Sequence, residues 1–340
     1  MPVTIKDIAK VAGVAHSTVS RALREHPAIA PDTISRIKEH AEKLGYVPSA
    51  VARGLKTNRS NALGVIVSRI DDPFFSEILQ ALDDEAHAAG YSLFIAADNR
   101  DLERLEIIIK TMGERRVDGI IVCSGNVTAR HGRQFQHQGI PIVAVDNQTI
   151  EDYQYSISHD HYYGCCQLSE HLLSMGHSKI AYLGNPRSTR VNRERQKGFL
   201  DTMAQAKLPV PSEYLFNGPN GRLDGGEVGA DYFLTQAEPP TAIVCYNDLM
   251  AIGLMHRYRE SNLSIPKNCS IVGFDNIAIS AYMVPPLTTF EQPKYQLGYA
   301  AARMMMSLLN NHEIQENQTT KTEVLRGTLI IRESTAPPKA

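Results

Sequence analysis

Residues 1–50 space their apolar positions three or four apart, as short amphipathic helices do. Thr4 precedes such a run over residues 5–12 and is suited to cap a helix there, which Gly13 would end. A second run over residues 16–23 follows closely, which is the spacing of a helix-turn-helix. A third starts at Pro31 and ends at Gly45. The pattern predicts one small domain of three helices.

From Ala62 onward, apolar runs of strand length alternate with segments long enough for helices. Strands are expected at Ala62–Val67, Tyr91–Ala96, Val117–Cys123, Ile140–Val145, Lys179–Leu183, Thr241–Cys245 and Ser270–Phe274. This alternation predicts parallel α/β sheets with helices on both faces. Because the stretch is too long for one regular sheet, we expect two similar lobes.

Length and composition limit the class of protein. A chain of 340 residues with 43% hydrophobic residues can fill more than one core. Its five cysteines are sparse and lie in apolar runs, which fits a reducing compartment better than a disulfide framework. The sequence has no apolar stretch of the signal-peptide or membrane-spanning type. We therefore expect a cytoplasmic protein that makes no membrane contact.

The charge is distributed unevenly along the chain. Residues 1–60 hold ten Lys and Arg against five Asp and Glu, a net charge of +5. Because the whole chain carries −2, the remaining residues carry −7. A basic N-terminal domain on an acidic body indicates a polyanion as the partner of that domain. A solvated run of charges is the alternative, and charge alone does not exclude it.

Polar residues follow the predicted strands, where open parallel sheets bind their ligands. These residues are Asp71, Asp72, Asp98, Asn99, Ser124, Asp146, Asn147, Asn185, Asn247, Asp248, Asp275 and Asn276. Carboxylates and amides beside Phe74 and Phe75 suit a carbohydrate, which offers hydroxyls and an apolar ring face. A single Asp in such a loop is more often a helix cap. We favour this local role for Asp72, Asp248 and Asn276, and the ligand role for Asp146 and Asp275.

Short motifs recur along the chain in a defined order and spacing. They are Ile5-Lys6-Asp7-Ile8-Ala9, Ala12-Gly13-Val14, Thr18-Val19-Ser20-Arg21, Leu44-Gly45-Tyr46-Val47-Pro48, Ala52-Arg53-Gly54-Leu55, Asp72-Pro73-Phe74-Phe75, Val117-Asp118-Gly119-Ile120-Ile121, Gly176-His177, Arg195 before Gly198-Phe199, Asn247-Asp248 and Val272-Gly273-Phe274-Asp275-Asn276. Over essentially its whole length the chain thereby resembles the lactose-repressor (LacI/GalR) family of bacterial transcription regulators.

The resemblance implies a small all-α helix-turn-helix domain, a hinge helix that orders on DNA, and a core of two doubly wound parallel-sheet lobes like a periplasmic sugar-binding protein. The implied bounds are 1–48 for the DNA-binding domain, 49–60 for the hinge helix and linker, 61–340 for the core, 61–160 with 292–324 for its first lobe, and 161–291 with 325–335 for its second. The chain would cross between lobes near residues 160, 291 and 325, and Leu325–Arg332 would add a strand. The last residues, Thr335-Ala336-Pro337-Pro338-Lys339-Ala340, stand where tetrameric members carry leucine heptads, so a homodimer is expected.

The resemblance also assigns roles to residues. Those expected to contact a near-palindromic double-stranded operator are Thr4, His16, Ser17, Thr18, Ser20, Arg21, Ser49, Ala52, Arg53 and Leu55. Those expected to hold a small effector, a sugar or sugar acid, are Phe74, Phe75, Asp98, Asp146, Asp160, Arg195, Asn247 and Asp275. Leu55 would wedge into the minor groove, and Arg21 would contact a guanine.

Two features depart from the family pattern or extend it. Ala15 and Ala30 stand where the family usually places a capping serine, and each missing cap costs ~1 kcal/mol. Besides Arg195, the stretch 187–195 holds Arg187, Arg190 and Arg193. These are either solvated or, if one faces the cleft, they favour an anionic effector, since a guanidinium binds a carboxylate in a bidentate fork.

Neither a metal site nor an enzyme is predicted. His159, His161, Cys165 and Cys166 cluster in sequence, but their spacing matches no tetrahedral zinc pattern. The sequence also lacks a phosphate loop, a dinucleotide-binding glycine motif and a nucleophile elbow, so we expect no cofactor. The remaining alternative is a cytosolic sugar-binding or sugar-converting protein that does not act through DNA.

Overall fold

The computed structural model describes residues 3–47, 59–146, 153–310 and 321–339. The chain divides into two compact units, Met1–Ser60 and Asn61–Ala340. Each unit is described by itself.

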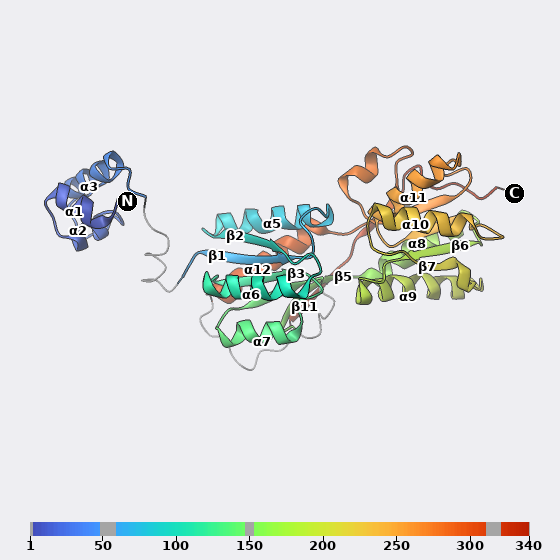
Figure 1. Ribbon diagram of the computed structural model, residues 1–340, viewed down its shortest axis with the longest axis horizontal. Helices are drawn as coiled ribbons and strands as arrows, with labels where there is room; N and C mark the ends of the chain where they lie inside the picture. The colour runs from blue at the N-terminus through green and yellow to red at the C-terminus, as the bar shows by residue number, and fades with distance from the viewer. Residues whose placement is uncertain (1–2, 48–58, 147–152, 311–320, 340) are drawn as a thin grey trace. The chain divides into compact units, whose positions relative to one another are not determined.

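The N-terminal unit contains α1 (Ile5–Ala12), α2 (His16–Ala22) and α3 (Pro31–Lys43) (Figure 1). Ile8, Val19 and Ile37, one from each helix, are fully buried against one another. The Asp7 carboxylate accepts a hydrogen bond from the Thr4 N–H at 2.8 Å, which fixes the start of α1. The predicted helix-turn-helix is confirmed.

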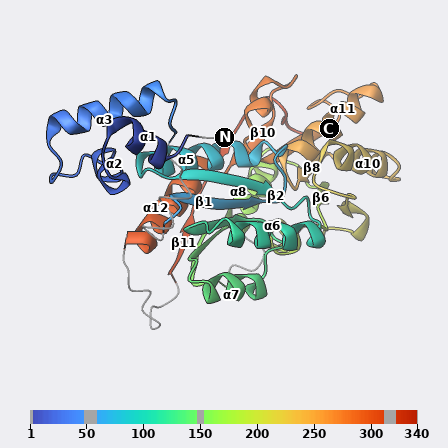
Figure 2. The ribbon, with the colours of Figure 1, turned by 60° about the vertical axis from the view of Figure 1, so that its left-hand side comes forward.

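The first lobe of the core is built on a sheet whose strand order is β11-β5-β4-β3-β1-β2, with all neighbours parallel. Its strands are β1 (Ala62–Val67), β2 (Ser92–Ala97), β3 (Gly119–Cys123), β4 (Ile142–Val145), β5 (Tyr155–His159) and β11 (Lys321–Leu325). Its helices are α5 (Phe74–Ala88), α6 (Leu102–Glu114), α7 (Ala129–His137) and α12 (Lys294–Asn310). Helices α5 and α12 cover one face of the sheet, and α6 and α7 cover the other (Figure 2).

The second lobe has the strand order β12-β10-β9-β8-β6-β7, and only β12 pairs antiparallel among the described strands. Its strands are β6 (Ile180–Gly184), β7 (Leu215–Asn217), β8 (Ala242–Cys245), β9 (Ser270–Asp275), β10 (Thr288–Glu291) and β12 (Thr328–Ile330). Its helices are α8 (His161–Ser174), α9 (Thr189–Gln205), α10 (Leu223–Leu234) and α11 (Asp248–Glu260), with short 3-10 turns at Ser212–Tyr214 and Ala278–Tyr282. Helices α8 and α9 cover one face, and α10 and α11 the other.

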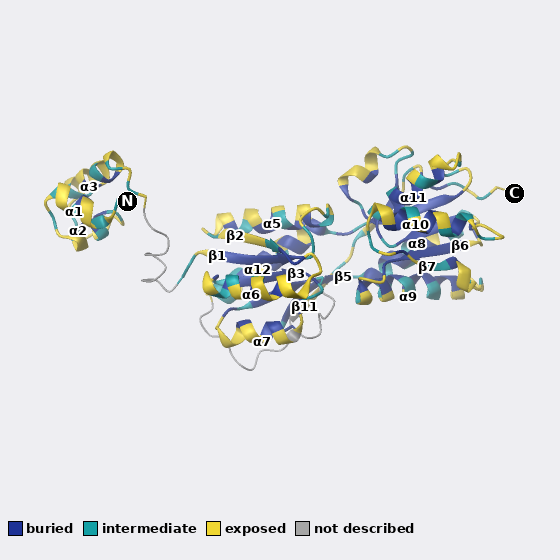
Figure 3. Cartoon of the chain, viewed as in Figure 1, coloured by how far each residue is buried: buried dark blue, intermediate teal, exposed yellow. Residues whose placement is uncertain are grey.

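Both lobes follow the same doubly wound order, which confirms the predicted fold class. Within the described residues, the chain passes between lobes after β5, after β10 and after β11. Instead of one strand over Leu325–Arg332, the third passage separates two short strands, β11 in the first sheet and β12 in the second, because the chain must change sheets there. Figure 3 shows the buried sheet in each lobe between more exposed helices.

The strand order positions the ligand site. In each sheet the order reverses beside the first strand of that lobe, between β1 and β3 and between β6 and β8. Loops at the carboxyl ends of such strands leave a crevice at the reversal, because they turn to opposite faces of the sheet. The loops after these four strands all contribute to the cleft described next.

Candidate functional site: a cleft between the lobes of the core

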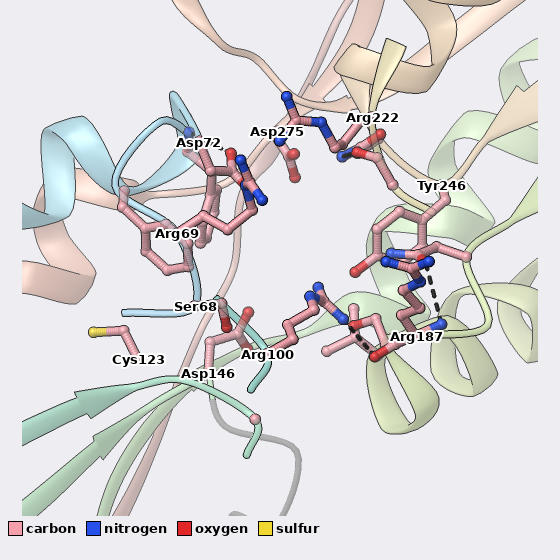
Figure 4. A pocket seen from close by; sticks show the side chains of 18 of the residues that line it. Ser68, Arg69, Asp72, Arg100, Cys123, Asp146, Arg187, Arg222, Tyr246 and Asp275 are labelled. Atoms are coloured by element: carbon pink, nitrogen blue, oxygen red, sulfur yellow. Dashed lines mark hydrogen bonds between the residues drawn. The ribbon is translucent and has the colours of Figure 1, made fainter. Parts of the chain in front are cut away.

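A polar cleft lies between the two lobes (Figure 4), with a cavity volume of about 150 Å³. A cavity of this size holds a molecule of roughly one six-membered ring. The first lobe lines it with Ser68, Arg69, Asp72, Phe74, Phe75, Ile78, Asn99, Arg100, Cys123, Gly125, Val145 and Asp146. The second lobe lines it with Asn185, Arg187, Ser188, Val191, Arg195, Asn220, Gly221, Arg222, Tyr246, Asn247 and Asp275, and Gln292 lies at the second passage between lobes.

Six of the eight residues expected to hold an effector lie along this cleft. They are Phe74, Phe75, Asp146, Arg195, Asn247 and Asp275. The structure places the other two, Asp98 and Asp160, outside its lining. The Asp98 carboxylate accepts hydrogen bonds from the Ser124 hydroxyl and the Arg100 N–H, and that of Asp160 caps α8 and pairs with Arg326 at 3.2 Å. Both carboxylates serve turns or caps, the alternative role of an Asp at a strand end.

Arg195 is the most constrained cation of the cleft, with only 3% of its side chain exposed. Its guanidinium carbon lies 3.7 Å from the ring centroid of Phe274 and 4.6 Å from that of Tyr246. Its nitrogens donate to the Tyr246 carbonyl and lie 3.6 Å from an oxygen of Asp275. This stacking fixes the plane of the guanidinium, so its remaining edge is pre-oriented for a ligand.

Asp275 stands at the end of β9 in an unusual backbone conformation, with φ of 119°. Gln292 donates a hydrogen bond to its carboxylate at 2.5 Å, and the buried Lys294 ammonium donates to its carbonyl oxygen at 2.7 Å. Burial raises the pKa of Asp275 to about 8 and outweighs the attraction of Arg195. At neutral pH this carboxyl is therefore mostly protonated and can donate as well as accept a hydrogen bond.

Asp146 behaves in the opposite way. Burial alone would raise its pKa, but His161, whose Nε2 lies 2.7 Å away, and Arg190 at 3.8 Å together hold that pKa well below its ordinary value. Asp146 therefore stays ionised. The cleft thus combines a neutral carboxyl, an ionised carboxylate and the amide of Asn247, which suits the mixed donors and acceptors of a polyhydroxy compound.

Sequence reasoning missed most of the arginines at this cleft. Arg69, Arg100 and Arg222 line it together with Arg187, which the sequence had left open. The Arg100 guanidinium of the first lobe donates to the Arg187 carbonyl of the second at 2.6 Å, and Arg222 of the second lobe pairs with Asp71 of the first at 3.2 Å. These side chains meet only once both lobes have folded, so no local sequence signal marks them.

The candidate DNA-contacting residues of the N-terminal unit lie on or beside α2. His16, Ser17 and Arg21 are exposed, and Thr18 and Ser20 are half-buried. Thr4 caps α1. The hinge candidates Ser49, Ala52, Arg53 and Leu55 lie outside the described residues. Ala15 and Ala30 precede α2 and α3 without a capping side chain, as the sequence indicated.

The described part of the chain offers neither a membrane-spanning helix nor a metal cluster. No helix there is long and apolar enough to cross a membrane. In the same residues, no group of three or more His, Cys, Asp or Glu is arranged to hold a metal ion. His159 and His161 contact each other edge to face, with ring centroids 5.0 Å apart, instead of converging with Cys165.

A helix-turn-helix unit joined to a two-lobed core with a polar cleft defines a ligand-responsive DNA-binding protein, and comparisons with known proteins agree. Residues 4–49 match the model of bacterial regulatory proteins of the lacI family, and residues 169–335 match a periplasmic binding protein-like domain. The transcriptional repressor PurR of Actinobacillus pleuropneumoniae is 33% identical over 317 residues, 93% of this chain and 94% of that protein. PurR of Vibrio cholerae is 33% identical over 311 residues, 91% and 92% of the two chains.

Solved structures give the same result. The Lac repressor dimer bound to operator and the anti-inducer ONPF is 25% identical, covers 99% of this chain and 100% of its own, and has a TM-score of 0.86. A LacI-family regulator from Enterococcus faecium with bound ribose is 26% identical, covers 82% and 100%, and has a TM-score of 0.74. The chain belongs to the LacI family of bacterial transcription regulators, and it is a DNA-binding transcriptional repressor of that family.

Proposed function

We propose that this repressor's affinity for its operator is controlled by a small sugar or sugar acid bound in the cleft between the core lobes. The observation that carries the proposal is the set of buried polar groups converging there, Arg195, Asn247 and Asp275, opposite Asp146. Buried donors and acceptors of this kind discriminate sharply, because an unmatched partner is left without a hydrogen bond. The ribose bound in the similar Enterococcus faecium regulator supports the same class of ligand.

The DNA-binding half of the proposal rests on α2. We expect its N-terminal residues His16 and Ser17, together with Arg21, to face the major groove, where an arginine can contact guanine through two hydrogen bonds. The proposed hinge over residues 49–55, with Leu55 as a minor-groove wedge, would be too short to stay helical alone and would order with its partner on DNA. An effector that changes the lobe arrangement would then act through this segment.

We further propose that the repressor is a homodimer on a near-palindromic operator, because protein symmetry is mirrored in the half-sites. An apolar surface on the second lobe supports this assembly. Tyr282 and Val284 are 79% and 85% exposed there, and Leu223 is exposed as well. These three residues border a hollow of about 490 Å³ over α10 and α11. The Lac repressor structure, a dimer, supports a second copy as the occupant.

The test uses the full chain and operator fragments selected from genomic DNA by gel shift. Compounds from a panel of monosaccharides, sugar acids and sugar phosphates that change operator binding are then titrated by calorimetry. We expect Asn247→Ala and Arg195→Ala to lose the response to these compounds while operator affinity stays within about twofold of the wild type. Arg193→Ala, exposed on α9 and outside the lining of both the cleft and the second-lobe hollow, is the control. If both cleft variants bind the active compound like the wild type, the cleft is misassigned.

A further inference from the structure

We propose that the effector is an anion, whose carboxylate or phosphate is held at the rim of the cleft by Arg187 and Arg100. This inference rests on the proposed effector function and narrows its ligand class.

The first support is the charge balance of the lining. Among the described residues, the cleft is lined by five arginines, namely Arg69, Arg100, Arg187, Arg195 and Arg222, and by three carboxyl groups, Asp72, Asp146 and Asp275. Burial raises the pKa of Asp275 to about 8, so this group supplies little negative charge at neutral pH, and burial also raises the pKa of Asp72. Asp146 is already paired with His161. The lining therefore carries a surplus of positive charge.

Two of the arginines have a partner just outside the lining. Arg69 donates two hydrogen bonds to Asp71, at 2.6 and 2.5 Å, and Arg222 reaches the same carboxylate at 3.2 Å. One carboxylate thus serves two guanidinium groups. Arg195 is likewise engaged, with Asp275 and with the Tyr246 carbonyl.

Arg187 and Arg100 remain as the cations of the lining that form no ion pair, and Arg100 also attracts the carboxyl groups of Asp72 and Asp98. None of the ion pairs found within the described residues involves either side chain, and both are exposed toward solvent at the cleft. The Arg100 guanidinium reaches across the cleft to the Arg187 main chain, so the two residues are brought together (Figure 4). Two arginines that line one cleft favour an anion there, because a carboxylate or phosphate is the group that a guanidinium binds best.

A second, independent feature of the backbone favours an anion at the same place. Helix α9 begins at Thr189, directly after Arg187 and Ser188, and its first turn has no acidic residue. The N-terminal end of a helix carries a partial positive charge. With 17 residues, α9 presents this end to the cleft, which is a favourable position for an anion.

The alternative explanation is that these arginines only hold the two lobes together. Exposed ion pairs of this kind each contribute about 0–1 kcal/mol to stability. Lobe closure alone therefore gives little reason for so many arginines at the cleft. The two explanations also differ in what they predict. If Arg187 only holds the lobes, its loss weakens neutral and charged ligands equally, whereas an anion-binding Arg187 affects the charged ligand alone.

The experiment compares matched ligands on the full chain by calorimetry. The probes are D-ribose with ribose 5-phosphate, and D-glucose with D-glucuronate and with glucose 6-phosphate. We expect a charged member to bind at least tenfold more tightly than its neutral partner. Whether the tighter ligand is the sugar acid or the sugar phosphate shows which of the two anionic groups the site binds. Arg187→Gln and Arg100→Gln should each remove most of that difference and leave the neutral sugar within about twofold. Arg193→Gln, exposed on α9 outside the cleft lining, is the matched control and should change nothing.

The outcomes separate this inference from the proposed function. If neutral sugars bind as tightly as their charged partners, or if Arg187→Gln weakens both alike, the anion inference is wrong and the effector cleft stands. If inorganic phosphate alone binds as tightly as the sugar phosphate, the arginines bind a free ion and the site does not recognise the sugar. The inference is then also wrong. If no probe binds the wild type, and none of the wider sugar panel does, both proposals are wrong.

Discussion

Replacing Asp275 by asparagine gives the sharpest test of the electrostatics of the cleft. Burial raises the pKa of this carboxyl to about 8 from the ordinary value of 3.8. Between these values the folded chain holds a proton that the unfolded chain releases, so this group's contribution to stability is complete at low pH and is lost as pH rises. The loss is about 1.4 kcal/mol per pH unit, or about 2.7 kcal/mol between pH 5 and pH 7. An asparagine side chain does not titrate, so the Asp275→Asn variant should gain stability relative to the wild type by that amount.

Thermal unfolding of the full chain at pH 5, 6 and 7 measures this effect. At about 2 °C per kcal/mol, the Tm difference between variant and wild type should grow by about 5 °C over this range. The nearby Asp248, whose burial raises its pKa to about 7, does not confuse the comparison. Asp275 is mostly uncharged over this range, so its replacement changes little of the charge around Asp248. Asp83→Asn, exposed on α5, is the control. A Tm difference that stays constant from pH 5 to pH 7 would refute the reasoning.

Three further predictions concern other parts of the chain. Arg21→Ala should weaken operator binding by about 1–3 kcal/mol at one base position and spare nonspecific binding, as measured by gel shift with operators altered base by base. Ala30→Ser should supply the missing cap of α3 and stabilise the N-terminal unit by ~1 kcal/mol, seen as a higher midpoint in chemical denaturation followed by circular dichroism. Gly226→Ala should destabilise the core by about 1–3 kcal/mol in calorimetry, because the new Cβ would lie 2.0 Å from the Met250 carbonyl oxygen, whereas the helical Gly132→Ala, with no neighbour closer than 3.5 Å, should be tolerated.

The hydrophobic pattern was sufficient to predict strands that are apolar along their length, such as β1 and β8. It missed strands that carry polar residues. β5 and β10 are buried but contain Ser156 and Thr289. In the fold these hydroxyls have partners, since Ser156 lies 3.0 Å from the Thr322 hydroxyl and Thr289 donates to Asp248 at 2.5 Å. Such partners come from distant parts of the chain, so hydropathy along the sequence cannot recognise the strands.

The candidate site was predictable to the extent that strand ends determine it. Asp146 directly follows β4 and Asp275 ends β9, and the topology alone brings strand ends to the cleft. The same rule also selected Asp98, which lies outside the cleft lining, because the position of a carboxylate does not reveal whether its hydrogen bonds go to its own loop. Arg222 was missed because its long side chain reaches the cleft from a loop that no predicted strand precedes. Arg100, three residues after β2, was missed because the strand-end rule was applied to acidic and uncharged polar residues.

The segments that pass between the lobes contact the ligand-facing residues directly. At the first passage, His161 lies between Asp146 of one lobe and Arg195 of the other, at 2.7 and 3.3 Å. At the second, Lys294 donates to the carbonyl of Asp275 and lies 3.2 Å from Glu77 on α5. Any rotation of one lobe against the other must stretch these contacts, because their two ends belong to different lobes. Asp146 and Asp275 are each hydrogen-bonded directly to a segment that passes between the lobes. A ligand that contacts either residue can therefore bias the lobe arrangement without a long chain of intermediate residues.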